Sequence, residues 1–275
     1  MRLLAVDMDG TLLNSDGRVP KANADAIRMA QKQGKQVIVC TGRGFQDALA
    51  PVRDAGIVCD FICMNGAGYF RRDGKLEYKK TLSYQKIDKI VELAERFHLV
   101  TDFMAEHGSY TISSKAQFLK CYVAGILLPM ADFEADMVWK RFKAVRYDEL
   151  KSKKIDIFKV SVIHPIPDVL RTVRDILEKE GGLALAPSHE TNIEITSDRA
   201  QKGIALMEYA KKHQIPEHEI MAIGDSGNDV SMLSLPIGVT VAMGNAMPAA
   251  CAAAKYQTKT NDENGVAWAM EKWFL

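Results

Sequence analysis

The stretch Leu3-Leu4-Ala5-Val6-Asp7-Met8-Asp9-Gly10-Thr11-Leu12 places a short apolar run directly before two carboxylates. Such a run is typical of a parallel strand buried on both faces, and ligand sites in open α/β sheets lie at the carboxyl ends of these strands. In an extended chain, Asp7 and Asp9 would point to the same side. The pair could hold a cation and divide nucleophilic and acid/base work. Two other interpretations stay open at this point: a surface turn, and a metal-holding pair as in some nucleotide-sugar transferases.

The composition predicts a globular protein without a strong charge bias. The 275 residues are 47% apolar and 26% charged, which predicts a packed core in one large domain or two medium ones. Lys and Arg (36) nearly cancel Asp and Glu (35), and the net charge of +1 gives no electrostatic case for nucleic acid or an anionic membrane. We therefore expect a small-molecule partner, with no nucleic acid and no membrane. Oligomeric state is not readable from the sequence.

The cysteines and the uncharged segments indicate where the protein works. Five cysteines without a C-x-x-C spacing favour a reducing compartment over a disulfide framework or a zinc site. The apolar run before Asp7 is too short for a signal-peptide core. The uncharged stretch 230–254 is broken by Pro236, Gly238 and Pro248, so it does not predict a membrane span. We expect a cytoplasmic protein.

Strand and helix patterns alternate at both ends of the chain. Apolar runs at 36–40 and 61–64, separated by amphipathic stretches, form a βαβαβ pattern that predicts a doubly wound, Rossmann-like parallel sheet. Alternation returns after Lys202, with strands expected at 220–223 and 239–242. The segment between contains hairpin-like strands and helices, among them a helix near 133–142. We predict a core domain from 1–81 and 190–275, with an α+β domain inserted over 82–189.

Four polar motifs follow or begin these core elements, and their chemistry is complementary. A carboxylate can accept a phosphoryl group, and a hydroxyl with N–H groups at a helix start can hold phosphate oxygens. A lysine neutralises charge, and further carboxylates hold Mg²⁺. A lysine in the first turn of a helix opposes the helix dipole, which favours a functional reason for Lys202. The motifs are Asp7-x-Asp9-Gly10-Thr11, Thr41-Gly42-Arg43, Lys202-Gly203 and Gly224-Asp225-Ser226-Gly227-Asn228-Asp229.

In this order, the motifs resemble those of the haloacid dehalogenase superfamily of aspartate-nucleophile phosphatases. The long segment between the second and third motifs resembles the type IIB cap of its Cof-type members. Three further stretches carry the same resemblance: Asn65-Gly66-Ala67, Ala242-Met243-Gly244-Asn245-Ala246 and Asn261-Asp262-Glu263-Asn264-Gly265-Val266. The resemblance covers essentially the whole chain and implies a Rossmann-like core with an inserted cap.

The resemblance also implies roles for individual residues. Asp7 would be the nucleophile, and Asp9 would protonate the leaving oxygen and then activate water, which requires a pKa raised from about 3.9. Lys202 would bridge nucleophile and phosphate, while Asp229 would act through water or by orienting Lys202. The implied catalytic residues are Asp7, Asp9, Thr41 and Lys202. The implied substrate-binding residues are Met8, Thr41, Gly42, Asn65, Lys202 and Asn228. The implied Mg²⁺ ligands are Asp7, Asp9, Asp225 and Asp229.

Three functions are compatible with these motifs to different degrees. The first is a phosphoric monoester hydrolase, dependent on Mg²⁺, that acts on small phosphorylated metabolites such as sugar, cofactor or nucleotide phosphates through an aspartyl-phosphate. The second is a phosphomutase or phosphotransferase that uses the same Asp7 but delivers the phosphoryl group to a hydroxyl. The third, an inactive binding module, predicts the loss of an essential carboxylate, and all are present. Retention of Asp9 disfavours a dehalogenase. The substrate depends on cap residues that the sequence does not rank.

Overall fold

The computed structural model describes residues 1–123, 139–186 and 190–275. The chain divides into two compact units, each described below by itself. Unit 1 consists of Met1–Lys79 and Ala200–Leu275, and unit 2 of Lys80–Arg199. None of the helices in the described part of the chain combines the length and apolar character needed to cross a bilayer.

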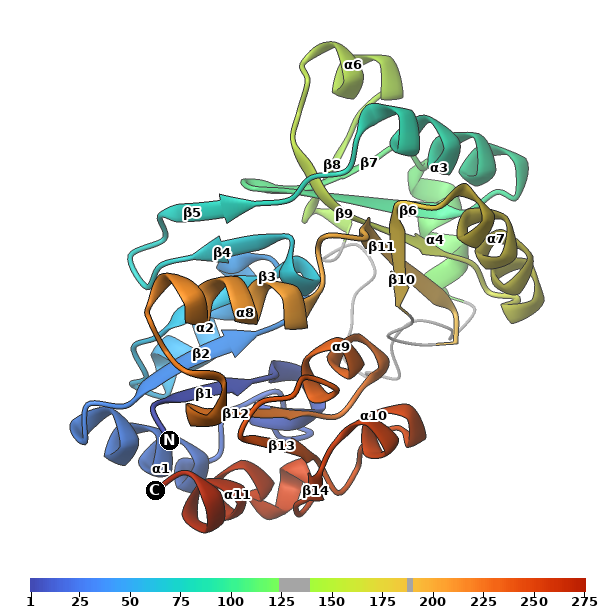
Figure 1. Ribbon diagram of the computed structural model, residues 1–275. Helices are drawn as coiled ribbons and strands as arrows, with labels where there is room; N and C mark the ends of the chain where they lie inside the picture. Colours follow the sequence, from blue (N-terminus) through green and yellow to red (C-terminus); the bar gives the residue numbers. More distant parts are fainter. Residues whose placement is uncertain (124–138, 187–189) are drawn as a thin grey trace. The chain divides into compact units, whose positions relative to one another are not determined.

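Unit 1 is built on an eight-stranded sheet in the order β14-β13-β12-β1-β2-β3-β4-β5. The six strands from β14 to β3 are parallel, and β4 and β5 are added antiparallel at one edge. The predicted parallel α/β core is confirmed (Figure 1). The strands are β1 (Leu3–Val6), β2 (Gln36–Cys40), β3 (Asp60–Cys63), β4 (Gly68–Phe70), β5 (Leu76–Lys79), β12 (Ile220–Gly224), β13 (Val239–Ala242) and β14 (Tyr256–Gln257).

Helices cover both faces of this sheet (Figure 1). On one face, α8 and α9 pack against Leu3, Ala5 and Ile38. On the other, α1 and α11 contact each other. Because both faces are covered, β1 is apolar at every position and fully buried, as expected for a parallel sheet. The helices are α1 (Lys21–Lys32), α2 (Phe45–Asp54), α8 (Lys202–Lys212), α9 (Val230–Leu233), α10 (Pro248–Ala253) and α11 (Gly265–Trp273).

The central strand ends where its apolar run ends, and the acidic pair lies at the start of the turn that follows. β1 stops at Val6, and Met8–Leu12 form a tight turn in which Gly10 has φ of +75°. A side chain at position 10 would be strained, because L residues rarely adopt this conformation. Asp9 lies in this turn rather than in the strand, so the alternation of an extended strand does not apply to Asp7 and Asp9.

Unit 2 contains a six-stranded sheet in the order β10-β11-β9-β6-β7-β8. All neighbours are antiparallel except β7 and β8. Apolar residues of α3 and α7 pack on one face, and α4 covers part of the other. The elements are β6 (Val100–Ala105), β7 (Gly108–Thr111), β8 (Phe142–Ala144), β9 (Ile157–Ile163), β10 (Leu183–Ala186), β11 (Asn192–Ser197), α3 (Tyr84–Arg96), α4 (Lys115–Val123), α6 (Tyr147–Ser152) and α7 (Pro167–Glu180).

One domain boundary and the end of one predicted helix need correction in this unit. The boundary expected at 189/190 lies instead at Arg199/Ala200, because β11 pairs with β9 and β10 and so belongs to the inserted sheet. Of the helix predicted near 133–142, residues 133–138 lie outside the described part of the chain. At its predicted end, Phe142 begins β8.

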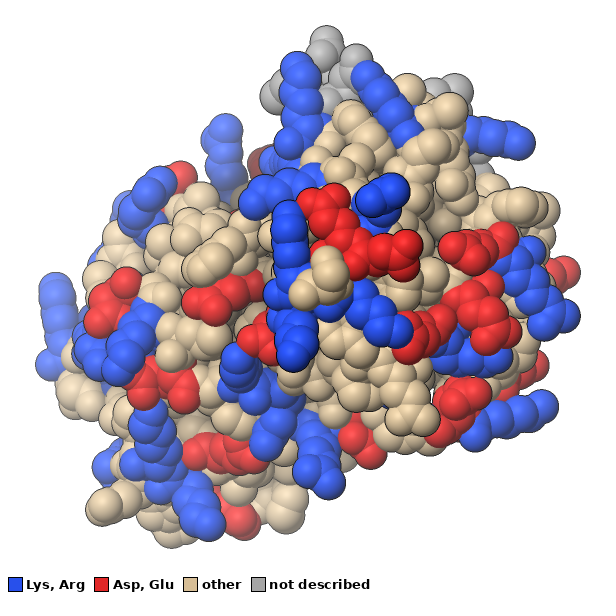
Figure 2. All heavy atoms as spheres, turned by 90° about the horizontal axis from the view of Figure 1, so that it is seen from above, with Lys and Arg blue, Asp and Glu red and all other residues tan. Residues whose placement is uncertain are grey.

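The surface reflects the balanced composition. On the face drawn in Figure 2, lysine and arginine side chains are interspersed with aspartate and glutamate side chains. This mixture agrees with the near-equal numbers of basic and acidic residues.

Candidate active site

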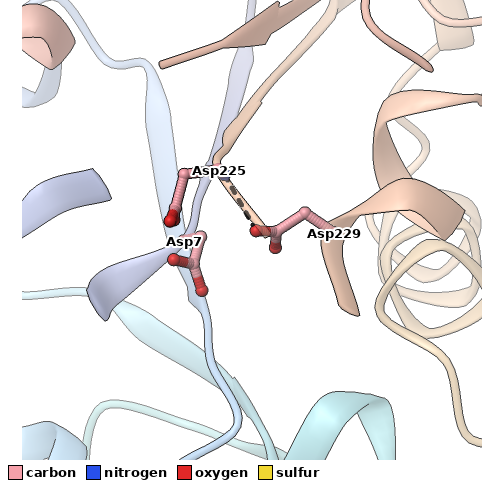
Figure 3. A group of neighbouring side chains, drawn as sticks. All are labelled: Asp7, Asp225 and Asp229. Atoms are coloured by element: carbon pink, nitrogen blue, oxygen red, sulfur yellow. Dashed lines mark hydrogen bonds between the residues drawn. The ribbon is translucent and has the colours of Figure 1, made fainter. Parts of the chain in front are cut away.

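Three carboxylates meet at the carboxyl edge of the parallel strands of unit 1. Asp7 follows β1, Asp225 follows the neighbouring strand β12, and Asp229 lies in the turn Gly227–Asp229. One oxygen from each lies within 4.8 Å of the others, and the three side chains point toward one another in Figure 3. Asp7 and Asp229 are buried, whereas Asp225 is half-buried. β1 and β12 bring together residues more than two hundred positions apart because they are adjacent and parallel.

Lys202, the first residue of α8, supplies the positive charge for this cluster. Its side chain is fully buried, and its Nζ donates hydrogen bonds to Asp7 Oδ1 (2.6 Å), Asp229 Oδ1 (2.7 Å) and Asn228 Oδ1 (3.1 Å). Burial lowers the pKa of Lys202, but the carboxylates of Asp229 and Asp7 raise it by more. The pKa of Lys202 is therefore above its ordinary value, and the ammonium stays charged.

The cluster nevertheless has more negative than positive groups. Burial raises the pKa of Asp7 well above its usual value; the Asp229 and Asp225 carboxylates raise it further, and Lys202 lowers it. Burial also raises the pKa of Asp225 to about 6, although the Thr11 hydroxyl opposes this by donating to Asp225 Oδ1 at 2.7 Å. One ammonium cannot compensate three carboxylates. A further cation would complete the charge balance.

These residues fit a divalent metal ion. Carboxylate oxygens converging from separate strands are the ligands that hard cations such as Mg²⁺ take. Burial and the neighbouring carboxylates raise the pKa of both Asp7 and Asp225, so a bound cation would compete with protons for these oxygens. The chemistry of the donor set therefore supports a divalent metal site.

Asp229 has a second task besides its contact with Lys202. Its Oδ2 accepts hydrogen bonds from the backbone N–H groups of Asp225 and Ser226, each at 3.0 Å, so it fixes the loop after β12. The backbone at Gly224 is close to this carboxylate, and a Cβ added there would lie 2.5 Å from Asp229 Cγ. The carboxylate thus orients both Lys202 and Asp225.

The Thr41 loop and the Asn65 loop join the same edge. Thr41 is fully buried directly after β2, and its hydroxyl accepts a hydrogen bond from the N–H of Arg43 (3.1 Å). The N–H of Asn65 donates to the Thr41 carbonyl (3.0 Å), and the Asn65 side-chain oxygen accepts from Asn228 Nδ2 (3.2 Å). Asn228 also contacts Lys202, so one chain of hydrogen bonds links the two loops to the charged cluster.

The structure does not place every predicted site residue in the cluster. Asp9 is 56% exposed, and its two oxygens accept from Arg43 Nε (2.8 Å) and Nη2 (2.5 Å). The Met8 side chain is fully buried, so a role in substrate binding would use its main chain. Gly42 lies between Thr41 and Arg43, half-buried. The turn after β1 therefore presents Asp7 to the cluster while Asp9 is bound to Arg43.

The motifs do not predict the contacts of two hydroxyl groups. Thr11 lies within the first motif, and its hydroxyl binds the Asp225 carboxylate. Ser231 accepts a hydrogen bond from the N–H of Gly203 (3.2 Å) where α8 begins. A Cβ at Gly203 would lie 2.1 Å from the Ser231 carbonyl oxygen, so the glycine permits this close contact. A hydroxyl four residues after Asp7 is the available signal for Thr11, whereas the sequence around Ser231 offers none.

The parallel sheet of unit 1 thus carries an aspartate, a buried lysine and two further carboxylates at its carboxyl edge, as expected of an α/β enzyme that binds its ligand there. The family model for haloacid dehalogenase-like hydrolases matches residues 4–270, and the chain belongs to that family. This confirms the relationship predicted from the motifs.

Individual relatives match over nearly their whole length. The chain is 33% identical to phosphatase YwpJ of Bacillus subtilis, covering 98% of this chain and 99% of that protein. It is 29% identical to the 5-amino-6-(5-phospho-D-ribitylamino)uracil phosphatase YcsE of the same organism, with coverage of 100% and 96%. The solved structure of a haloacid dehalogenase-like hydrolase from B. subtilis matches with a TM-score of 0.85 and 32% identity over both full chains. The chain is thus a phosphoric monoester hydrolase.

Proposed function

We propose that this enzyme hydrolyses small phosphorylated metabolites in the cytoplasm, with Mg²⁺, through a phosphoryl group bound covalently to Asp7. The observation that carries the proposal is the fully buried Lys202, which contacts Asp7 at 2.6 Å beside two further carboxylates. An anionic nucleophile can approach an anionic phosphate only where positive charge is fixed nearby. Five free cysteines support a reducing compartment.

The residues that would hold Mg²⁺ are Asp7, Asp225 and, by family resemblance, the main chain of Asp9. The motifs also imply Asp229 as a ligand, but its two oxygens already bind Lys202 and the 225–226 backbone. We therefore assign Asp229 to orientation rather than to the ion. When bound, the ion would add positive charge beside the phosphoryl oxygens.

The chain's own residues account for both chemical steps. A carboxylate oxygen of Asp7 attacks phosphorus, the bond to the leaving oxygen breaks, and Asp9 gives that oxygen a proton. Asp9 then takes a proton from a water molecule that attacks the phosphorus of the aspartyl-phosphate, which frees Asp7 and phosphate. Lys202, the Thr41 hydroxyl and the N–H of Gly42 would hold the phosphoryl oxygens.

The ion pair with Arg43 adds a requirement to this scheme. Arg43 contacts both oxygens of Asp9, so both oxygens already accept hydrogen bonds. Asp9 must therefore release Arg43 before its carboxyl group can reach the leaving oxygen.

A phosphomutase or phosphotransferase would use the same Asp7 and differ only in the acceptor. Release of inorganic phosphate in the absence of any acceptor other than water separates the two. The activity in the name of the relative YcsE supplies one candidate substrate for a panel that also includes sugar phosphates and nucleotides.

The test combines this panel with a trapping experiment. The wild-type protein with Mg²⁺ and a ³²P-labelled substrate, quenched in acid within one turnover, should carry protein-bound label. Asp7→Asn, which keeps the size of the side chain, should carry none and release no phosphate. Phosphate release that survives in Asp7→Asn would exclude Asp7 as the nucleophile.

A further inference from the structure

Two stretches outside the four motifs, 242–246 and 261–266, lie together beside the turn that follows Asp7. The N–H of Gly244 donates to the carbonyl of Lys259 (2.9 Å), and the N–H of Asn261 donates to Asn245 Oδ1 (3.0 Å). Both stretches carry the family resemblance, and neither contributes a group to the chemistry proposed above. Their position in unit 1 indicates another role.

Amide side chains from these stretches hold the main chain of the turn. Asn245 Nδ2 donates to the carbonyl of Gly10 (2.8 Å), and Asn261 Nδ2 donates to the carbonyl of Leu13 (3.0 Å). Asn245 uses its oxygen and its nitrogen at the same time, because Oδ1 accepts from Asn261. Its orientation is therefore fixed from two sides.

The same segment also holds the other side of the carboxylate cluster. Two residues after Asn245, the N–H of Met247 donates to the carbonyl of Asp225 (2.7 Å). Gly10 and Asp225 are close together, since a Cβ at Gly10 would lie 2.5 Å from Asp225 Oδ2. Residues 245–247 thus connect the turn after β1 with the loop after β12.

We propose that Asn245 is a positioning residue that sets the distance between the Asp7–Gly10 turn and Asp225, and thereby the affinity of the site for a divalent cation. The inference rests on the metal dependence in the proposed function. A cation bound by carboxylates from two strands needs those strands at a fixed separation. Groups that orient metal ligands without contacting the ion typically change its affinity about 10- to 100-fold when they are removed.

The experiment measures metal binding directly and without substrate. Calorimetric titration of EDTA-treated, dialysed protein with Mg²⁺, and with Mn²⁺ as a second probe, gives the Kd of each variant. Asn245→Ala removes both hydrogen bonds without adding charge, and its Kd should rise about tenfold or more. The kcat at saturating Mg²⁺ should fall much less, because Asn245 does not touch the reacting atoms.

Thr260→Ala is the matched control in the neighbouring segment. This substitution removes the hydrogen bond from the Thr260 hydroxyl to Glu263 Oε2 (2.7 Å) and, like Asn245→Ala, does not change the net charge. It leaves the hydrogen bonds to the carbonyls of Gly10 and Asp225 in place. This control should lower the unfolding temperature and leave the metal Kd unchanged. If Asn245→Ala does not fold, Asn245→Ser, which can serve only one of the two partners, should still weaken binding at least threefold.

The outcomes are distinct. A metal Kd for Asn245→Ala or Asn245→Ser within twofold of the wild-type value would overturn the positioning role. An equal rise in Thr260→Ala would overturn it as well, because the effect would then reflect general loosening of the segment. If the wild-type protein itself binds neither Mg²⁺ nor Mn²⁺, the metal dependence in the proposed function fails first, and the inference fails with it.

Discussion

Replacement of Lys202 by methionine tests whether this lysine holds the carboxylate cluster together. Methionine has a similar length and no branch, so the cavity is small and the main change is the lost charge. Asp7 (4% exposed) and Asp229 (0%) then lose a cation that lies 2.6 and 2.7 Å away. Removing one partner of a buried ion pair costs about 3–5 kcal/mol of unfolding free energy. For a protein of this size that corresponds to a Tm lower by about 6–20 °C.

The assay is thermal unfolding followed by circular dichroism in EDTA. The loss should be largest at pH 8 and smaller at pH 5, because burial raises the pKa of Asp7, and its unpaired carboxyl group takes up a proton at lower pH. Adding Mg²⁺ should restore part of the Tm of Lys202→Met, because the ion replaces some of the missing charge. Phosphatase activity should be abolished throughout.

Lys159→Met provides the matched control in unit 2. Lys159 is also buried (4% exposed side chain) and forms an ion pair with Glu194 at 2.8 Å. Its replacement should lower the Tm, and Mg²⁺ should not restore it. A Tm for Lys202→Met within about 2 °C of wild type at pH 8 in EDTA would refute the reasoning, because the structural cost would then be below about 1 kcal/mol.

Three further predictions concern the metal, the backbone and the acid/base residue. Burial raises the pKa of Asp225 to about 6, so protons should compete with the cation for this carboxylate. The Mg²⁺ affinity measured by calorimetry should therefore fall by up to about tenfold for each pH unit below 6. An affinity that stays constant over this range would contradict the competition. Gly66 has φ of +98°, and a Cβ added there would lie 2.4 Å from the Gln201 carbonyl oxygen, whereas Gly17 has φ of +71° with open space around it. Gly66→Ala should therefore unfold at a lower urea concentration than Gly17→Ala. Equal urea midpoints for the two variants would count against the close contact at Gly66. In Asp9→Asn, a ³²P-labelled substrate with a good leaving group should still phosphorylate Asp7, because that step then needs no acid. The phosphorylated protein should accumulate, because no base activates the water that hydrolyses it. Rapid steady-state release of phosphate by this variant would exclude Asp9 as the base.

Much of the parallel core could be predicted because its strands are buried on both faces. The runs at 3–6, 36–40 and 220–223 are almost continuously apolar. A strand with one face in solvent would instead alternate apolar and polar residues, so these runs indicate strands covered on both faces. The β4–β5 hairpin was not predicted, since β4 has three residues and β5 alternates with the charged Glu77 and Lys79. Short edge strands carry little hydrophobic signal.

The site shows the same division between local and tertiary information. Asp7 and Asp225 each directly follow an apolar run that predicts a parallel strand. Because parallel strands end at the same edge of the sheet, the sequence positions alone predict that the two residues lie close together. The pairing of Asp9 with Arg43 could not, because it depends on the turn at Gly10 and on a partner 34 positions away. Likewise, the apolar and polar residues of β11 alternate as in any half-buried strand, and nothing in its sequence specifies which of the two sheets it joins.

The placement of β1 between β2 and β12 has a consequence for how the chain is made. β1 is synthesised first, but β12 leaves the ribosome only after all of unit 2, Lys80–Arg199. Unit 2 is continuous in sequence and can complete its own sheet early. Until β12 emerges, one edge of β1 has no strand to pair with, and an unpaired apolar edge invites aggregation or chaperone binding. The nascent chain therefore carries its most vulnerable strand for most of its synthesis, and the catalytic centre is among the last features to assemble.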